Sequence, residues 1–106
     1  MPIQLHCDLQ VASGHEAEIE RVFTEVFSPA MARREGFVEV RFLKLITSYK
    51  GNPEPWNYRL VIGFETEELR QAWAACDDHQ RLWPEMEKHL TGECWQGWLY
   101  GVAGAR

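Results

Sequence analysis

The segment from residue 57 to residue 90 constrains the fold of this chain more than any other. Apolar side chains alternate over residues 58–64, as in a strand that buries one face. Thr66 is well placed to cap a helix, whose apolar residues recur at helical spacing until the pattern fades near Cys76. A second helical piece follows over residues 77–90. A strand that leads into a broken helix predicts a sheet covered by helices, with room for a small pocket between the two layers.

The N-terminal part of the chain has the same pattern of a strand followed by a helix. Residues 3–11 alternate, with apolar side chains at odd positions and polar ones at even positions. Ser13 and Glu16 fit a capping box, which predicts that a helix starts there. An apolar stripe then runs over residues 19–27. We expect Pro29 to kink or end this helix, or to begin a new first turn.

Three strands are predicted in the rest of the chain. Residues 37–48 have the pattern of a long strand, and the turn-forming sequence at residues 50–55 predicts an antiparallel hairpin with a strand over residues 56–64. Pro84 is expected to bend the second helical piece or to mark its true start. Residues 93–102 form the last predicted strand.

The order of these elements predicts a ferredoxin-like β-α-β-β-α-β fold. It is one α+β domain over residues 1–106, with a four-stranded antiparallel sheet and helices on one face. On the other face, the first strand carries Gln4, His6, Asp8 and Gln10. A mixed face of this kind suits a second sheet better than open water. We therefore expect a homodimer in which two sheets close a dimeric α+β barrel, with His6 hydrogen-bonded to Asp8 inside it.

Composition limits the partners and the compartment. The formal net charge of -5 argues against a nucleic-acid partner, which would favour a basic surface. No apolar run approaches the roughly 18 residues that cross a bilayer, and the N-terminus lacks a secretion signal, so we expect a cytoplasmic protein without membrane contact.

The cysteines (Cys7, Cys76 and Cys94) are expected to be free thiols. Neither they nor the scattered histidines have metal-ligand spacing, so no metal is expected.

The candidate site lies where the broken helix faces the third strand. His79 could act as a general base or donate a hydrogen bond to a substrate, although a polar residue at a helix start is the simpler interpretation. The two preceding aspartates favour its protonated form, whereas the helix dipole opposes it. Trp73 and Trp83 could form walls for a flat ligand, or could simply pack in the core. The predicted site has His79 as the catalytic residue and Tyr58, Leu60, Phe64, Trp73 and Trp83 as the residues that bind a small hydrophobic or aromatic molecule.

The sequence FETEELRQAWAACDDHQRLWPEM, which starts at Phe64, resembles the antibiotic biosynthesis monooxygenase-like family of dimeric α+β barrels. In that family an aromatic residue ends the strand, Ser/Thr-Glu-Glu starts the helix, and a histidine recurs near the position of His79. Residues 11–14 and the Glu-Gly-Phe sequence at residues 35–37 match upstream parts of the family pattern. The resemblance covers nearly the whole chain and implies both the fold and the dimer.

The activity that the resemblance implies is oxygenation of a small phenol- or quinol-like compound without a metal or flavin cofactor. Characterised oxygenases of the family carry an Asn, Trp and Tyr set, and this chain has Leu60, Phe64 and Arg70 there. Arg70 is expected to be exposed, unless it clamps a phenolate or carboxylate. Haem-degrading members carry an Asn, Trp and His set, and this chain has Cys7, Phe64 and Trp83 there. The alternative function is therefore a non-catalytic dimer that binds a small hydrophobic ligand or acts as an accessory protein, and haem binding or degradation is a third.

Overall fold

The structure is a computed structural model that describes residues 1–92 and 95–106. Two predictions, the thiol of Cys94 and the strand start at Glu93, lie outside the described residues. The elements follow the predicted β-α-β-β-α-β order. They are β1 (Ile3–Leu9), α1 (Glu16–Val22), the π-helical η1 (Phe23–Phe27), α2 (Ser28–Ala32), β2 (Phe37–Lys44), β3 (Tyr58–Phe64), α3 (Glu67–Ala75), α4 (Asp77–Glu87) and β4 (Gln96–Gly101).

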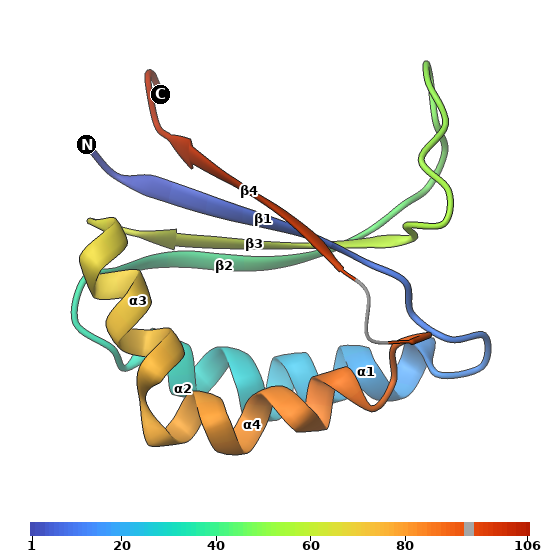
Figure 1. The fold of residues 1–106 in the computed structure, drawn as a ribbon, viewed down its shortest axis with the longest axis horizontal. Coiled ribbons are helices and arrows are strands. Elements are labelled where there is room, and N and C mark those ends of the chain that lie inside the picture. The colour runs from blue at the N-terminus through green and yellow to red at the C-terminus, as the bar shows by residue number, and fades with distance from the viewer. Residues whose placement is uncertain (93–94) are drawn as a thin grey trace.

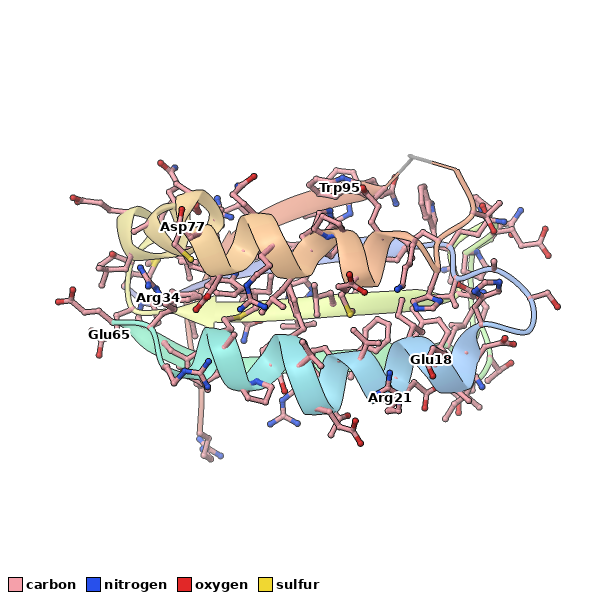
Figure 2. All side chains as sticks on the ribbon, turned by 90° about the horizontal axis from the view of Figure 1, so that it is seen from below. Glu18, Arg21, Arg34, Glu65, Asp77 and Trp95 are labelled. Carbon is pink, nitrogen blue, oxygen red and sulfur yellow. The ribbon has the colours of Figure 1, made fainter. Side chains whose placement is uncertain are left out.

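The four strands form one antiparallel sheet in the order β2-β3-β1-β4. In the central strand β3, Leu60 lies between Cys7 of β1 and Phe42 of β2. The helices cover one face of the sheet and leave the opposite face open (Figure 1). On the covered face, the continuous α1–η1–α2 helix and α4 lie side by side (Figure 2). The predicted ferredoxin-like fold and the hairpin between β2 and β3 are thereby confirmed.

The core fills the space between the sheet and the helices. Because side chains alternate along β3, every second residue from Tyr58 to Phe64 points toward the helices and is at most 6% exposed. Leu9 of β1 and Ile19 of α1 are fully buried in the same cluster. Burial of each large apolar side chain contributes about 1.5–3 kcal/mol. This layer is therefore the main source of stability.

The first helix starts later than predicted, because the capping box does not form. The helix begins at Glu16 after His15, and no side chain caps it. Gly14 has a positive φ of 87°, and the His15 amide donates to the carbonyl of Ala12 at 3.0 Å. This turn keeps Ser13 outside the helix and leaves its hydroxyl unable to act as the cap.

The two prolines interrupt the helices less than predicted. Pro29 has no N–H to donate, and the chain widens before it into η1, where the Ser28 amide reaches back to the Phe23 carbonyl. Pro29 then lies in the first turn of α2, which is one of the predicted alternatives. The helix α4 starts at Asp77 and runs through Pro84, so this proline does not mark its start. Within the parts of the chain that the structure describes, none of the helices is long and apolar enough to cross a membrane.

The strands β2 and β3 are shorter than predicted, because residues 45–57 leave the sheet as an arm. The strand β2 ends at Lys44, and β3 begins at Tyr58. Pro53 and Pro55 have no amide donor and cannot extend the ladder. The arm rises from one end of the sheet on the side away from the helices (Figure 1). It therefore stands beside the open face.

Candidate functional site

The helices α3 and α4 position the candidate site. Thr66 caps α3, since its hydroxyl accepts a hydrogen bond from the Leu69 amide at 3.1 Å. Extended backbone at Cys76 ends α3 and starts α4, as predicted. This sharp break lets side chains from the two consecutive helices meet over the sheet.

Three of the predicted site residues come together at this break. The ring of His79 lies 5.3 Å from that of Trp73 and 6.3 Å from that of Trp83, between ring centroids. Phe27 of η1 completes the group, at 5.7 Å from Trp73 and 6.0 Å from Trp83. These four rings are the aromatic cluster. It is an apolar group with one titratable ring in it, and its Phe27 and Trp73 are fully buried.

The three predicted site residues of β3 lie in different parts of the core. Leu60 and Phe64 are fully buried. Tyr58, at the other end of the strand from Phe64, stacks on Phe42 at 4.8 Å and donates a hydrogen bond to Glu20 at 2.6 Å. Burial and this contact raise the pKa of Tyr58 well above its ordinary value. The six predicted residues therefore do not line one pocket, and Tyr58 stands apart.

Three buried polar atoms of α3 and α4 have no hydrogen-bond partner among the residues that the structure describes. They are Oε2 of Glu67, Nε1 of Trp73 and Nδ1 of His79. Glu67, Arg70 and Trp73 recur at three-residue spacing, so they share one face of α3. A buried polar group without a partner costs about 1–3 kcal/mol. We call Glu67, Trp73 and His79 the polar site, together with Arg70 and with Cys7, whose pKa the charge of Arg70 affects.

Arg70 is drawn inward, which corrects the prediction that it is exposed. Its side chain is only 19% exposed, and its Nε donates to Oε1 of Glu67 at 2.5 Å. An arginine covered in this way is held rigid, with its other nitrogens fixed in orientation. The glutamate three residues earlier on the same helix is the sequence signal that could have indicated this ion pair.

Burial, more than the charge of Arg70, sets the pKa values in the polar site. Burial, followed by the nearby Arg70 cation, lowers the pKa of His79, so the imidazole is neutral at pH 7. Of the two opposing effects expected at His79, the preceding aspartates do not prevail, and Asp78 pairs with Arg81. Burial raises the pKa of the Cys7 thiol to about 11, although Arg70 opposes this change. Cys7 is therefore a thiol and not a nucleophile at neutral pH.

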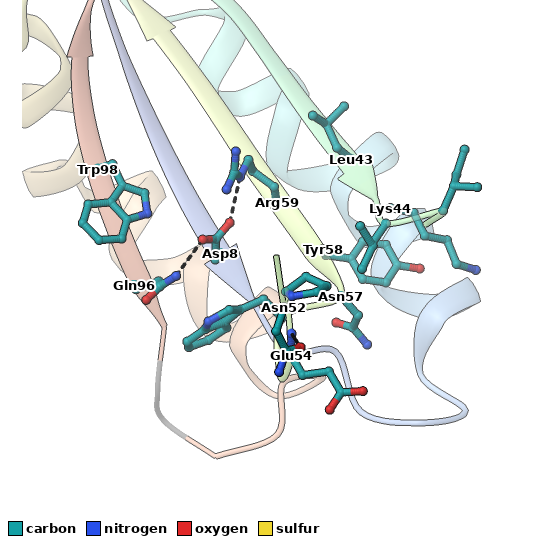
Figure 3. Close-up of a pocket in the computed structure, with 14 residues that line it drawn as sticks. Asp8, Leu43, Lys44, Asn52, Glu54, Asn57, Tyr58, Arg59, Gln96 and Trp98 are labelled. Carbon is teal, nitrogen blue, oxygen red and sulfur yellow. Dashed lines mark hydrogen bonds and ion pairs between the residues drawn. The ribbon is translucent and has the colours of Figure 1, made fainter. Parts of the chain in front are cut away.

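A second hollow, the open-face cleft, lies on the other side of the sheet at the base of the arm (Figure 3). Its volume is about 720 Å³. At its floor the buried carboxylate of Asp8 accepts hydrogen bonds from Arg59 at 2.7 Å and Gln96 at 2.8 Å. Burial opposes ionisation of Asp8, but these bonds hold its pKa below its ordinary value. His6 does not bond Asp8 as predicted, because its Nε2 lies 2.9 Å from the side-chain oxygen of Gln4.

The open-face cleft was not predicted, and of the six predicted site residues only Tyr58 lines it. Strand alternation could have found its floor, because Asp8 and Arg59 pair directly across β1 and β3 with opposite charges. The arm, which forms a wall of the open-face cleft, has no alternating sequence pattern from which its position could be predicted. In residues 1–92 and 95–106, no three side chains of His, Cys, Asp or Glu gather as a bound metal would require.

Comparisons with known proteins identify the fold. No protein-family model matches the chain, and no curated protein matches it in sequence. Solved structures do match over nearly the full length. A protein from Bordetella bronchiseptica, proposed to be an antibiotic biosynthesis monooxygenase, superposes with a TM-score of 0.78 at 21% identity, over 96% of this chain and 97% of that one.

Two further matches have the same fold. SnoaB, a cofactor-independent oxygenase from Streptomyces nogalater, gives a TM-score of 0.74 at 17% identity, over 98% of this chain and 95% of its own. A dimeric ferredoxin-like protein of unknown function from Jannaschia sp. CCS1 gives 0.79 at 13% identity, over 96% of this chain and all of its own. Identities this low establish the fold alone. The chain therefore has the fold of the antibiotic biosynthesis monooxygenase-like proteins.

Proposed function

We propose that this protein is a homodimeric, cofactor-independent oxygenase of a small aromatic compound with an ionisable hydroxyl group. The observation that carries the proposal is the polar site, in which Glu67, Trp73 and His79 each leave a buried polar atom unpaired within residues 1–92 and 95–106. The substrate would lie against the aromatic cluster and supply the missing hydrogen bonds. The oxygenase fold of SnoaB supports this assignment at the level of the scaffold.

The residues of the polar site suit the formation of a substrate anion. His79 is neutral at pH 7, so it can accept the phenolic proton as a general base. Arg70, held by Glu67, would stabilise the phenolate that forms. The aromatic cluster excludes water, which strengthens both interactions.

The reaction needs no external reductant. The bound anion gives one electron to O2, and the resulting radical and superoxide join through a new C–O bond. The imidazolium of His79 then returns its proton to the peroxide anion, which becomes a hydroperoxide. Loss of water from this hydroperoxide leaves a carbonyl, so that one methylene carbon and one O2 yield one C=O and one H2O. The contribution of the protein is to generate and hold the anion.

The dimer is proposed from the surface that the fold leaves uncovered. Leu43 of β2, together with Trp98 and Tyr100 of β4, is among the large apolar side chains that are about half exposed. In addition, Trp98 and Tyr100 pair with His6 and Gln4 across the strands, which places them on the open face. Exposed apolar surface of this kind marks a protein interface. The Jannaschia protein of the same fold is described as dimeric.

Oxygen uptake with anthrone as the probe tests the oxygenase. The wild type is expected to consume O2 faster than buffer alone. His79→Gln should lower kcat/KM about 100-fold, which is typical for loss of a general base, and Arg70→Gln about tenfold. Arg33→Gln, which removes an exposed arginine from the end of α2, is the matched control and should leave the rate unchanged. A wild-type rate equal to that of buffer across a panel of anthrones and hydroquinones would refute the proposal.

A non-catalytic ligand-binding dimer is the second candidate. The residues Leu60, Phe64 and Arg70 favour it, because they stand where the oxygenases that the sequence resembles carry Asn, Trp and Tyr. Tryptophan fluorescence discriminates the two. Ligands that change the emission of the wild type without any oxygen uptake would support binding alone, and emission unchanged by the whole panel would argue against both.

A further inference from the structure

The arm (residues 45–57) carries large apolar side chains that the fold of one copy leaves in solvent. Ile46 is 95% exposed, Tyr49 is fully exposed, and Leu45 is half exposed. Solvent-exposed apolar side chains that gather on one projecting segment indicate a contact surface.

The base of the arm is fixed to the sheet. Asn57 holds the segment that follows β1 with two hydrogen bonds: its Oδ1 accepts from the Val11 amide at 2.8 Å, and its Nδ2 donates to the Val11 carbonyl at 3.0 Å. The Leu45 amide donates to the Asn57 carbonyl at 2.9 Å, and the Trp56 amide closes a turn on Pro53 at 3.0 Å. Such preorganisation lowers the entropy lost when the arm meets a partner.

The arm and the open face present a continuous surface. The arm stands on the side of the sheet opposite the helices (Figure 1), and the open-face cleft lies between its base and the strands (Figure 3). Leu45, Ile46 and Trp56 of the arm line this cleft together with Trp98 of β4. A molecule that covers the open face would meet the arm at the same time.

The charges in the cleft favour a second copy as that molecule. Two acidic residues, Asp8 and Glu54, and two basic residues, Lys44 and Arg59, line it. A two-fold interface brings one patch against an identical patch, so each patch must complement itself. A cleft with equal numbers of both signs meets this condition, whereas an anionic or cationic partner would favour one sign.

We propose that the arm clasps a second copy of this chain. Ile46 and Tyr49 of each copy pack against the partner, and the partner closes the open-face cleft. This inference rests on the homodimer of the proposed function and adds the segment on which that dimer depends.

Sedimentation over a range of concentrations tests the clasp. The double variant Ile46→Ser/Tyr49→Ser is expected to raise the dimer Kd at least tenfold. The control is Leu99→Ser, which removes a half-exposed side chain opposite Leu5 on the helix side of the sheet and should change Kd less than twofold. Circular dichroism checks that each variant is folded. A double variant that dimerises as tightly as the wild type would overturn the inference while leaving the homodimer intact.

Trypsin cleavage after Lys50 is a second readout, because this residue lies in the arm. Cleavage should be at least fivefold slower at concentrations where the wild type is dimeric than after dilution to monomer. Equal rates would overturn the clasp. A wild type that is monomeric at every concentration would overturn both the clasp and the homodimer, whereas oxygen uptake would still report separately on the oxygenase activity.

Discussion

The two faces of the sheet bury similar residues to very different extents. On the helix side, Trp73 is fully buried and Arg70 is covered beside it. On the open side, Trp98 is about half exposed, and Arg59 reaches Asp8 from the edge of a wide cleft. The helix side is complete within one copy except for a few polar atoms, whereas the open side lacks a whole covering layer. We propose that the missing partner of the first is a small molecule and that of the second is another protein surface.

The largest expected difference between the faces concerns their tryptophans. Trp73→Ala empties a fully packed site and should lower the free energy of unfolding by about 3–5 kcal/mol. Trp98→Ala should change the free energy of unfolding of the monomer by less than about 1 kcal/mol, because its ring is half in solvent already. Urea titrations below the dimer Kd measure both. Equal losses would mean that the open face contributes to the core.

A comparison of two glycines separates the stability cost of a packing clash from the cost of backbone conformation. Gly36 and Gly51 both have a positive φ, which costs a residue with a Cβ about 1–2 kcal/mol. A Cβ at Gly36 would in addition collide with Leu69 of α3, whereas a Cβ at Gly51 in the arm meets nothing. Gly36→Ala should therefore cost about 1–3 kcal/mol more than Gly51→Ala. Thermal unfolding of the two variants makes the comparison, and equal costs would show that Leu69 yields freely.

Substitution of Asp8 measures how much its buried carboxylate contributes to stability on the open side. Its pKa is lower in the folded protein than in the unfolded chain, so its contribution is present above pH ~4 and is lost as the pH falls through the folded pKa. At pH 7, Asp8→Asn should cost about 1 kcal/mol, a modest value because Arg59 is partly exposed. The difference from the wild type should vanish at the acid end of a series of urea titrations. A constant difference would contradict the pKa shift.

Substitution of His79 tests how a buried titratable group on the helix side affects stability. It acts in a different pH window and has the smallest expected effect. Its pKa is also lowered in the folded protein, so the unfolded chain binds the proton first as the pH falls below ~6.5. The wild type should therefore lose stability between pH 7.5 and 5.5 through this group, and His79→Gln should lose less. Identical pH profiles for the two proteins would show that His79 titrates freely.

The sequence predicted elements whose periodicity follows from their packing. The alternation in β1 and β3 and the apolar stripes of the helices identified the core, because burial on one face requires that spacing. The sequence also placed His79, Trp73 and Trp83 on either side of the helical break at Cys76, but whether their rings meet needed the structure.

Features that depend on long side chains or on loops were missed. Arg70 turns inward through its contact with Glu67. The sequence alone predicts that a charged arginine on a helix is exposed, because it does not show how the long side chain is directed. The capping box failed because Gly14 turns the chain away, and the arm has turn residues but no period from which its direction follows. The predicted hydrogen bond of His6 to Asp8 failed because Arg59 of the neighbouring strand offers Asp8 a charged donor.

The indole N–H signals of the tryptophans test the separate roles of the two faces most directly, in one series of two-dimensional NMR spectra. Addition of anthrone should shift the signals of Trp73 and Trp83 on the helix side. Dilution through the dimer Kd should instead shift those of Trp56 and Trp98 on the open side. Anthrone that moves only Trp56 and Trp98 would place the ligand in the open-face cleft and contradict the assignment of the polar site.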